Sequence, residues 1–442
     1  MNNVNLVYGI KDKPKFGQVI LFAIQQLLAI MAATIAVPAI IGNGMSQTAA
    51  LFGAGIGTLV YLLFTKFKSP VFLGSSFAFL GSMGAAFAGG VSAQLGYLGL
   101  IIGAAFAGLV YVIIAIIVKC CGVKWINKLM PAVVIGPTVA IIGLSLAGNA
   151  IGDLTGASGA VANGVSGYAC ILCGLVTLAV TMLCSTFGKK IFKMIPFIMG
   201  ILAGYAVASV LTLIGMKTND PSLMIVNFGL FQNIAWMPDF TFLTAVKGIS
   251  ELTPAYIATI AVAYVPVAFV VFAEHIADHK NLSSIIGTEL LEEPGLHRTL
   301  LGDGIGSFAG AIFGGCPNTT YGESIGCVAI SGNASVVTIL ATAILAIVVS
   351  FVGPFATFLA TIPACVMGGV CVSLYGFIAV SGLKMLQQVD LSENRNLFTA
   401  SVILISGIGG LTVSFGKVTL TTIACALILG ILTNVMLGKK KD

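Results

Sequence analysis

Charged residues are scarce in this chain. Only 8% of its 442 residues are Asp, Glu, Lys or Arg, and no long polar stretch interrupts the sequence. Soluble globular proteins contain roughly 25% of these residues, so the shortage excludes a soluble domain of ordinary size. A hydrophobic fraction of 58% and a mean hydropathy of +1.08 accompany it. The composition therefore predicts a chain that lies almost entirely in a lipid bilayer.

Signals for secretion and for metal binding are also missing. The first apolar run, 16–41, is too long for a signal peptide and ends without a small-residue cleavage site, so we expect a first membrane span there. The ten Cys residues lie mostly inside apolar runs, and the pairs 120/121 and 170/173 lack the flanking His or further Cys of a metal site. We therefore expect thiols that pack in the interior, and no metal or other cofactor.

Apolar runs separated by polar breaks predict about fourteen membrane segments. Their ranges are 17–41, 48–65, 71–91, 94–118, 131–151, 167–187, 192–215, 253–279, 299–315, 319–331, 334–353, 363–382, 396–414 and 418–437. The chain has 21 Lys and Arg residues. With a cytoplasmic N-terminus, this count of segments places only Lys217, Lys247 and Lys417 outside and the other 18 on the cytoplasmic side. The positive-inside rule then predicts a multi-pass protein of the cell (inner or plasma) membrane with both termini in the cytoplasm. The net charge of +6 reflects this topology, and we expect no nucleic-acid partner.

Two short motifs recur seven segments apart. The run FGAGIGT at 52–58 returns as LGDGIGS at 301–307, and MPAVVIG at 130–136 returns as IPACVMG at 362–368. Because seven is odd, the second copy crosses the membrane in the opposite direction, which predicts two inverted 7-segment repeats with a substrate site between them. A dinucleotide site needs a strand before such glycines, so close packing of membrane helices is the better interpretation.

The third and tenth segments correspond in this repeat, and both are broken. The third opens with SPVFLGSSF at 69–77, and the tenth follows CPNTTYGE at 316–323. Proline and small polar residues disfavour a continuous helix, and free backbone groups survive inside a membrane only where they pair or line a cavity. We therefore expect short extended stretches that cross each other, followed by helix N-termini that hold a polar ligand.

Few ionisable residues lie inside the segments. Glu274 and Glu323 are the clear cases, and buried acids of this kind usually serve a transport pathway. Asp278 follows Glu274 by one helical turn on the same face, so the two could share a proton. His275 and His279 point away from that face, and we interpret them as structural.

Two other polar positions receive structural interpretations. Asp303 lies near the start of the ninth segment, where a carboxylate complements the helix dipole, so we favour a capping role. Gln25 and Gln26 lie in the middle of the first segment, and we expect at least one of them to face the interior.

Four motifs carry a resemblance to a known family: LGSSFAF at 73–79, AEH at 273–275, PGLHR at 294–298 and PNTTYGE at 317–323. The chain resembles the nucleobase–cation symporter-2 (nucleobase–ascorbate transporter) family over nearly its whole length, and its uracil-transporting members most of all. The resemblance implies an all-α polytopic fold with short antiparallel β-strands in segments 3 and 10, and a possible homodimer through the gate domain. It implies a core domain of residues 1–121 and 246–355 and a gate domain of residues 122–245 and 356–442. The substrate-binding residues that it implies are Glu274, Glu323, Phe77, Gly322, Tyr321, Ala33 and Tyr375.

The chain departs from the family pattern at a few positions. Gln25-Gln26 replaces a Gln-His pair in the first segment, and Ser324 stands where Asn usually follows the acid of segment 10. Glu323 replaces the Gln typical of xanthine carriers, which favours uracil, whereas an acid at position 278 is frequent in xanthine carriers.

These observations lead to one functional prediction and several alternatives. We expect a secondary active transporter that imports uracil or a close nucleobase with a proton, carried by Glu274 and shared with Asp278; Na⁺ is the less favoured coupling ion. A xanthine or purine permease is the alternative within the family. An anion carrier of similar architecture is disfavoured because the candidate site has two acids and no basic residue. A membrane hydrolase lacks its Gly-x-Gly-Asp motif, so we expect no enzyme, and a passive channel remains a further alternative.

Overall fold

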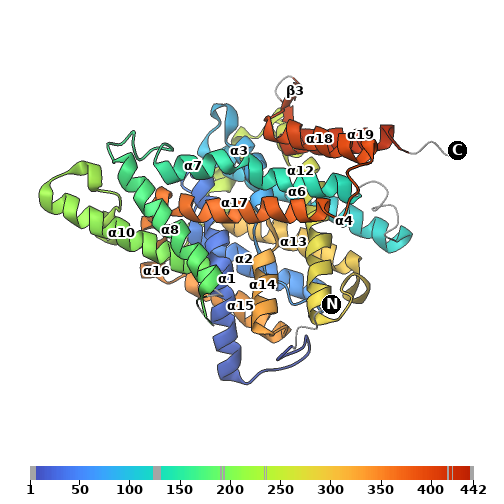
Figure 1. Cartoon of the computed structure of the whole chain (residues 1–442), viewed down its shortest axis with the longest axis horizontal. Coiled ribbons are helices and arrows are strands. Elements are labelled where there is room, and N and C mark those ends of the chain that lie inside the picture. The colour runs from blue at the N-terminus through green and yellow to red at the C-terminus, as the bar shows by residue number, and fades with distance from the viewer. Residues whose placement is uncertain are drawn as a thin grey trace.

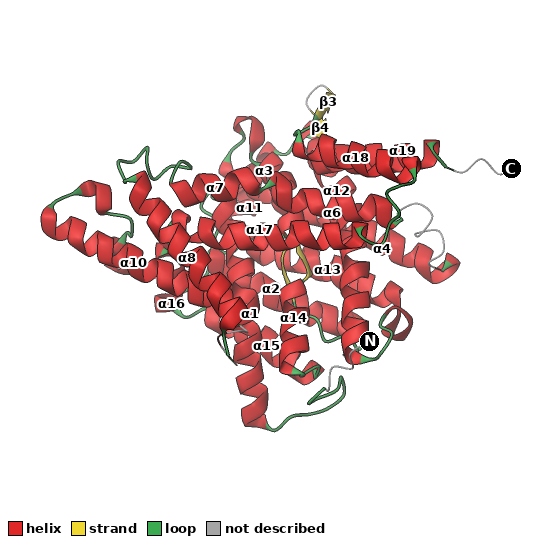
Figure 2. Ribbon diagram, in the orientation of Figure 1, coloured by secondary structure: helices red, strands yellow, loops and turns green. Residues whose placement is uncertain are grey.

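The computed structural model describes residues 6–122, 131–189, 192, 195–232, 234, 236–415, 418–420 and 422–438. The described chain is almost entirely helical, with four very short strands (Figure 2). Its first half contains α1 (Phe16–Ile41), α2 (Gln47–Phe64), β1 (Leu73–Ser75), α3 (Leu80–Ala86), α4 (Ala93–Cys121), α6 (Ala132–Ser145), α7 (Ala147–Thr155), α8 (Gly167–Phe187), α10 (Pro196–Thr218) and α11 (Thr241–Ala245). A single 3-10 turn, η1 (Phe77–Phe79), links β1 to α3.

The second half contains α12 (Pro254–Ile286), α13 (Leu296–Gly314), β2 (Asn318–Thr320), α14 (Gly322–Ser331), α15 (Val336–Ser350), α16 (Gly353–Thr361), α17 (Ala364–Leu386), α18 (Asn394–Ile408), β3 (Val413–Phe415), β4 (Val418–Leu420) and α19 (Thr422–Met436). Short 3-10 and π-helical turns, at Ala88–Gly90, Pro221–Leu223, Phe228–Gln232, Val246–Glu251 and Leu291–Gly295, join these elements. The β3–β4 hairpin between the last two helices was not expected from the sequence.

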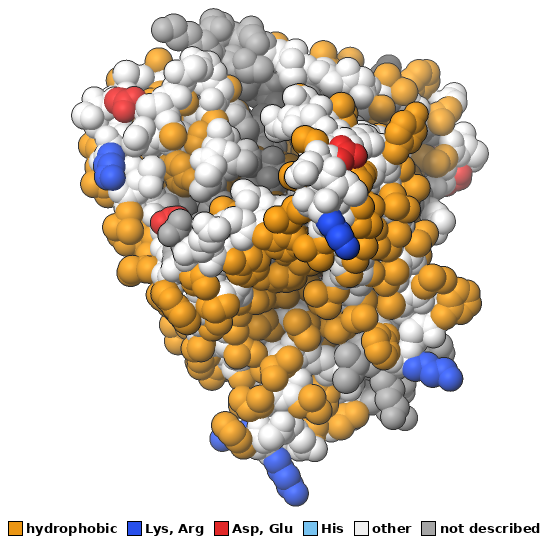
Figure 3. Space-filling model, turned by 90° about the vertical axis from the view of Figure 1, so that its left-hand side faces the viewer, with side chains coloured by type: hydrophobic (Ala, Val, Ile, Leu, Met, Phe, Trp, Pro, Cys, Tyr) orange, Lys and Arg blue, Asp and Glu red, His pale blue; other side chains and the backbone are white. Residues whose placement is uncertain are grey.

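The helices form a multi-pass membrane protein. Among the described residues, eight helices are long and apolar enough to cross a bilayer, or nine if α15 and α16, bent by 83°, make one span. Each of the fourteen predicted ranges contains a helix, or a strand followed by a helix, within the described chain. On the face shown in Figure 3, hydrophobic side chains cover a broad area, and acidic and basic side chains are few and isolated. The predicted all-α polytopic fold is confirmed.

Glycines allow repeat-related helices to pack closely. A Cβ atom on Gly57 of α2 would lie 2.7 Å from the carbonyl oxygen of Gly306 in α13, and one on Gly53 would collide with Gly310 O. The glycine runs of the second and ninth segments therefore face each other, which confirms helix packing as their role. The pair α6 and α17 lies side by side in Figure 1 and shows the same closeness, since a Cβ on Gly136 would lie 3.0 Å from Gly382 O.

The two broken segments meet in an antiparallel strand pair. Leu73 lies opposite Thr320 and Ser75 opposite Asn318, and Ser76 N–H donates to Pro317 O at 2.9 Å. The Tyr321 hydroxyl donates to Ser75 O at 2.7 Å. These bonds satisfy the backbone of both extended stretches, as expected for irregular backbone inside a membrane protein. In this antiparallel pairing, η1 and α14 start at opposite ends of the strand pair.

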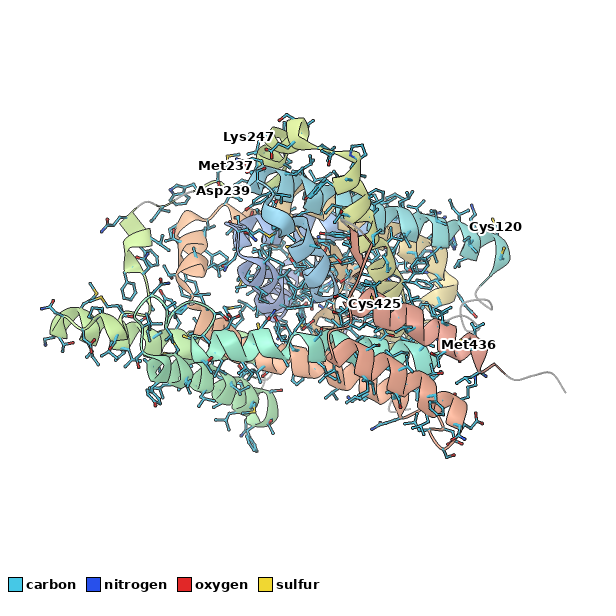
Figure 4. All side chains as sticks on the ribbon, turned by 90° about the horizontal axis from the view of Figure 1, so that it is seen from above. Cys120, Met237, Asp239, Lys247, Cys425 and Met436 are labelled. Carbon is cyan, nitrogen blue, oxygen red and sulfur yellow. The ribbon has the colours of Figure 1, made fainter. Side chains whose placement is uncertain are left out.

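The helices pack in two groups. The first comprises α1, α2, α4, α12, α13, α14 and α15, and the second comprises α6, α7, α8, α10, α17, α18 and α19. In Figure 1 the pairs α8 with α10 and α18 with α19 lie at opposite ends of the second group. The chain between α10 and α12 carries Met237, Asp239 and Lys247 at one edge of the molecule (Figure 4). The assignment of residues 1–121 and 246–355 to a core and of the rest to a gate remains a prediction.

Candidate functional site

A small cavity of about 50 Å³ lies beside the strand pair and is lined by both broken segments. Phe77, Gly322 and Glu323 line it from the starts of η1 and α14, and Glu274 lines it from α12. Ile142 of α6 and Ile378 of α17 close it from the second group of helices. The cavity therefore lies between the two helix groups and between the two repeats.

A larger cavity of about 340 Å³ shares residues with the small one. Both cavities are lined by Glu274, Gly322, Glu323 and Ile378. Asp278 lines only the larger of the two. Its remaining wall is mostly apolar and comes from α6, α10 and α17, through Val139, Phe197, Leu374, Phe377 and Met385. Together the two cavities combine three carboxylates with an apolar wall, and no Lys or Arg among the described residues lines either of them.

A third cavity, of about 480 Å³, lies on the other side of Phe77. It shares Phe77 and Ala78 with the small cavity, and Ser145, Val267 and Thr412 contribute to its wall. The Phe77 ring packs edge-on against Tyr375, with ring centroids 5.7 Å apart. Phe77 thus stands between the carboxylate-lined cavities and the third cavity.

The starts of two helices line the small cavity together with the carboxylates. Phe77 and Gly322 are the first residues of η1 and α14, and first-turn N–H groups have no acceptor within their own helix. A Cβ atom built on Gly322 would meet nothing within 4 Å, so the backbone at this point borders open space. Helix N-termini of this kind attract polar and negatively polarised groups.

The carboxylate of Asp278 has a protein partner. Thr320 of β2 donates its hydroxyl hydrogen to Asp278 Oδ2 at 2.7 Å. This bond connects α12 to the strand that precedes Tyr321, which the sequence alone did not indicate. Glu274, one turn earlier, borders both cavities and lines the small one together with Phe77, Gly322 and Glu323.

Three further predicted residues occupy different places. Tyr321 lines the small cavity, and its hydroxyl is engaged with the strand β1. Tyr375 is buried and reaches the site through its contact with Phe77, and it lines neither carboxylate cavity. Ala33 is buried in α1 and likewise lines neither cavity; Ala29 is the α1 residue that does.

The interpretation of Asp303 as a helix cap is wrong. Helix α13 begins at Leu296, so Asp303 lies two turns inside it and is buried. Its Oδ2 lies 2.7 Å from Nδ1 of His275. His279 Nε2 lies 2.7 Å from the hydroxyl of Tyr61, so both histidines are hydrogen-bonded inside the protein, as expected of structural groups.

Two positions that depart from the family pattern contact each other. Gln26 Nε2 donates to Ser324 Oγ at 2.6 Å, and the Phe72 N–H donates to the same hydroxyl at 3.1 Å. Gln26 is therefore an interior wall residue, as one of the two glutamines was expected to be. The contact holds α14, and with it Glu323, against α1 and the segment before β1.

Solved structures with the same fold are membrane transporters. The chain superposes with a TM-score of 0.64 on the transmembrane domain of a cyanobacterium bicarbonate transporter, BicA, at 16% identity, covering 96% of this chain and 99% of that one. It superposes with a TM-score of 0.65 on the murine Slc26a9 anion transporter in the inward-facing state, at 13% identity, covering 96% of this chain and 69% of that one. At these identities the likeness establishes the fold alone.

Sequence comparisons show the family to which the chain belongs. The model of the Permease family matches residues 17–416. The uracil permease of Bacillus caldolyticus is 39% identical over 438 residues, which cover 98% of this chain and 94% of that protein. The uracil permease of Escherichia coli (strain K12) is 36% identical over 427 residues, which cover 96% and 92%.

The fold and the cavity between the two helix groups define a multi-pass membrane permease, a class of transporters. Within that class, the chain belongs to the Permease family, in the nucleobase–cation symporter-2 group that its four motifs resemble.

Proposed function

We propose that this protein imports uracil, or a closely related nucleobase, across the cell membrane by proton symport. The observation that carries the proposal is that two carboxylates, Glu274 and Glu323, line one cavity with the helix starts at Phe77 and Gly322. The names of the relatives support uracil as the substrate.

Uracil is a flat neutral ring with two N–H donors and two carbonyl acceptors. Two carboxylates accept from its N–H groups, while two backbone N–H groups donate to its oxygens, so the donor and acceptor patterns match. Bonds to charged acceptors in a site shielded from water are the stronger kind. The flat faces of the ring would pack against Phe77 and the apolar wall that Ile142 and Ile378 contribute.

The proton has a natural place among the three acids. Glu274, Asp278 and Glu323 line one cavity to which none of the described Lys or Arg residues contributes, and like charges in such a site favour retention of a proton. We assign the transported proton to Glu274, shared with Asp278. A core of residues 1–121 and 246–355 would move against the gate formed by the rest, exposing the site to each side in turn.

A purine carrier and an anion carrier are the alternatives. The anion transporters of similar fold do not decide between them, because their likeness reaches the fold only. Within the described chain, no Lys or Arg lines either carboxylate cavity, which argues against an anion. Glu323 in place of a Gln argues for uracil over xanthine.

Uptake into proteoliposomes tests the proposal. A pH gradient should drive accumulation of labelled uracil, a protonophore should abolish it, and unlabelled uracil should compete better than xanthine or sulfate. Glu274→Gln should abolish gradient-driven accumulation, and any remaining uracil exchange should lose its pH dependence.

Glu293→Gln is the matched control. Glu293 lies in an exposed loop, where its ion pair with Lys68 lowers the pKa of its carboxyl group, and exposed pairs of this kind contribute little. This variant should transport like the wild type. Wild-type accumulation by Glu274→Gln would remove Glu274 as the proton carrier.

A further inference from the structure

A closed cavity of about 10 Å³ lies in the first group of helices, apart from the carboxylate cavities. Tyr111 of α4, Asp303 and Ser307 of α13, and Asn318 and Thr319 of β2 are its polar lining residues. This volume holds about one water-sized sphere. Ser307 follows Asp303 by one helical turn, so both belong to the same face of α13.

Two buried oxygens on residues that line this cavity lack a protein partner within the described chain. They are Oδ1 of Asp303 and the hydroxyl oxygen of Tyr111. Asp303 is 1% exposed and Tyr111 is 3% exposed, so bulk water does not reach either side chain. A buried polar group without a hydrogen bond is costly, and one ligand that serves both groups removes both costs.

The other oxygen of Asp303 belongs to a neutral pair. Thr299 donates its hydroxyl hydrogen to Leu296 O at 3.0 Å, so its oxygen accepts from Nε2–H of His275 at 3.0 Å. One proton then lies between Nδ1 of His275 and Oδ2 of Asp303, which are 2.7 Å apart. Shared between a carboxylate and an imidazole, this proton leaves the pair without net charge.

Charge and hydrogen positions decide what the cavity binds. A monovalent cation would meet a neutral pair, and the hydroxyl hydrogen of Tyr111 would have to turn away from it. A water molecule instead accepts from Tyr111 and donates to Asp303 Oδ1. It retains a second hydrogen for one of the other polar groups that line the cavity.

We propose that this cavity is a binding site for a single water molecule held between Tyr111 and Asp303. The water completes a chain of hydrogen bonds from α4 through α13 to His275 of α12. His275 is the neighbour of Glu274, and the chain ties together three helices of the first group. The site does not depend on which substrate the permease carries.

The sign of a stability change tests the proposal on the purified full-length protein. If water occupies the cavity, Tyr111→Phe removes a hydrogen bond and lowers the thermal unfolding midpoint. If the cavity is dry, the same change removes an unsatisfied hydroxyl, and the midpoint rises or stays the same, which overturns the proposal. Unfolding should be followed in Na⁺, K⁺ and choline chloride at equal ionic strength.

Tyr264→Phe is the matched control. Tyr264 is fully buried, its hydroxyl also lacks a protein partner in the described chain, and its ring stacks on Phe79, but it does not line this cavity. We expect the thermal unfolding midpoint of Tyr264→Phe to equal or exceed that of the wild type. If the thermal unfolding midpoint of the wild type rises in Na⁺ but not in K⁺ or choline, and Tyr111→Phe abolishes this rise, the cavity binds a cation and the water proposal is overturned. Density for an ordered water within hydrogen-bond distance of both oxygens in a high-resolution structure supports the proposal, and a dry cavity there contradicts it.

Discussion

At the scale of single residues, Glu323 is positioned by contacts that do not involve its own carboxylate. It lies in the first turn of α14, and the next residue, Ser324, is held by Gln26 and by the backbone of Phe72. Because the backbone beside Glu323 is fixed in this way, only its side chain remains to be ordered when a ligand binds. Its chemistry is therefore open to a conservative test.

Glu323→Gln should weaken uracil binding on the order of 10-fold to 100-fold, since a hydrogen bond to a charged acceptor contributes about 1.5–3 kcal/mol. The amide keeps one acceptor oxygen but brings an N–H₂ group that faces a donor of the ring. We expect purine binding to fall less or to rise. Calorimetry on purified protein measures both ligands.

Thermal unfolding of the same variant provides the control, because a neutral amide in place of a buried acid should hardly change stability. Uracil binding as tight as that of the wild type would show that Glu323 does not select the substrate. The site would then have to be redrawn around Glu274 and Asp278.

At the scale of elements, the strand pair and the helices after it form one unit. β1 and β2 are only three residues each, and the Tyr321 hydroxyl bond to Ser75 extends their contact. A Cβ on Gly74 would collide with the Tyr321 ring, so glycine is required at this crossing. Gly322 differs, because open space surrounds its missing side chain.

Gly322→Val should therefore abolish uracil binding without unfolding the protein, since the added methyl groups occupy the cavity and not the packed interior. The matched comparison is Gly57→Val in α2, where the Cβ would lie 2.7 Å from Gly306 O. That variant should lose stability and expression, as overpacking does. Size-exclusion profiles and calorimetry separate the two outcomes, and normal uracil binding by a well-folded Gly322→Val protein would remove α14 from the site.

At the scale of the whole molecule, cavities lie on both sides of Phe77. Ser381 of α17 lines the 340 Å³ cavity near Lys384, and Ser145 of α6 lines the 480 Å³ cavity. In the predicted topology, Lys384 is cytoplasmic. The first cavity would then open toward the cytoplasm and the second toward the outside.

Cysteine labelling in intact cells tests this orientation. Ser145→Cys should react with an impermeant thiol reagent added outside, whereas Ser381→Cys should react only after the membrane is opened. Native cysteines that could react must first be replaced by Ser in the protein used for labelling. They are the accessible Cys120, Cys121 and Cys184, and Cys327, which lines the 340 Å³ cavity. Labelling of Ser381→Cys from outside and of Ser145→Cys only from inside would mean that the protein has the opposite orientation.

The sequence by itself determined the class of fold and several elements of the site. Long apolar runs are stable in a lipid bilayer and not in water. Glycines repeated at helical spacing predict closely packed helix pairs, such as α2 with α13. Pro70 and Pro317 interrupt helices at corresponding positions, which predicted the strand crossing. Glu274 and Glu323 were evident because an acid inside an apolar run is costly unless it has a function.

Only the tertiary structure decided which side chains meet. The bonds from Thr320 to Asp278, from Gln26 to Ser324 and between His275 and Asp303 join residues 28 or more positions apart, and no local pattern encodes such pairs. Asp303 was misread because dipole complementation acts only within the first turn, and the helix begins earlier than the apolar run suggested. The apolar wall from α6, α10 and α17 was equally hidden, because its residues are indistinguishable in sequence from any that face lipid.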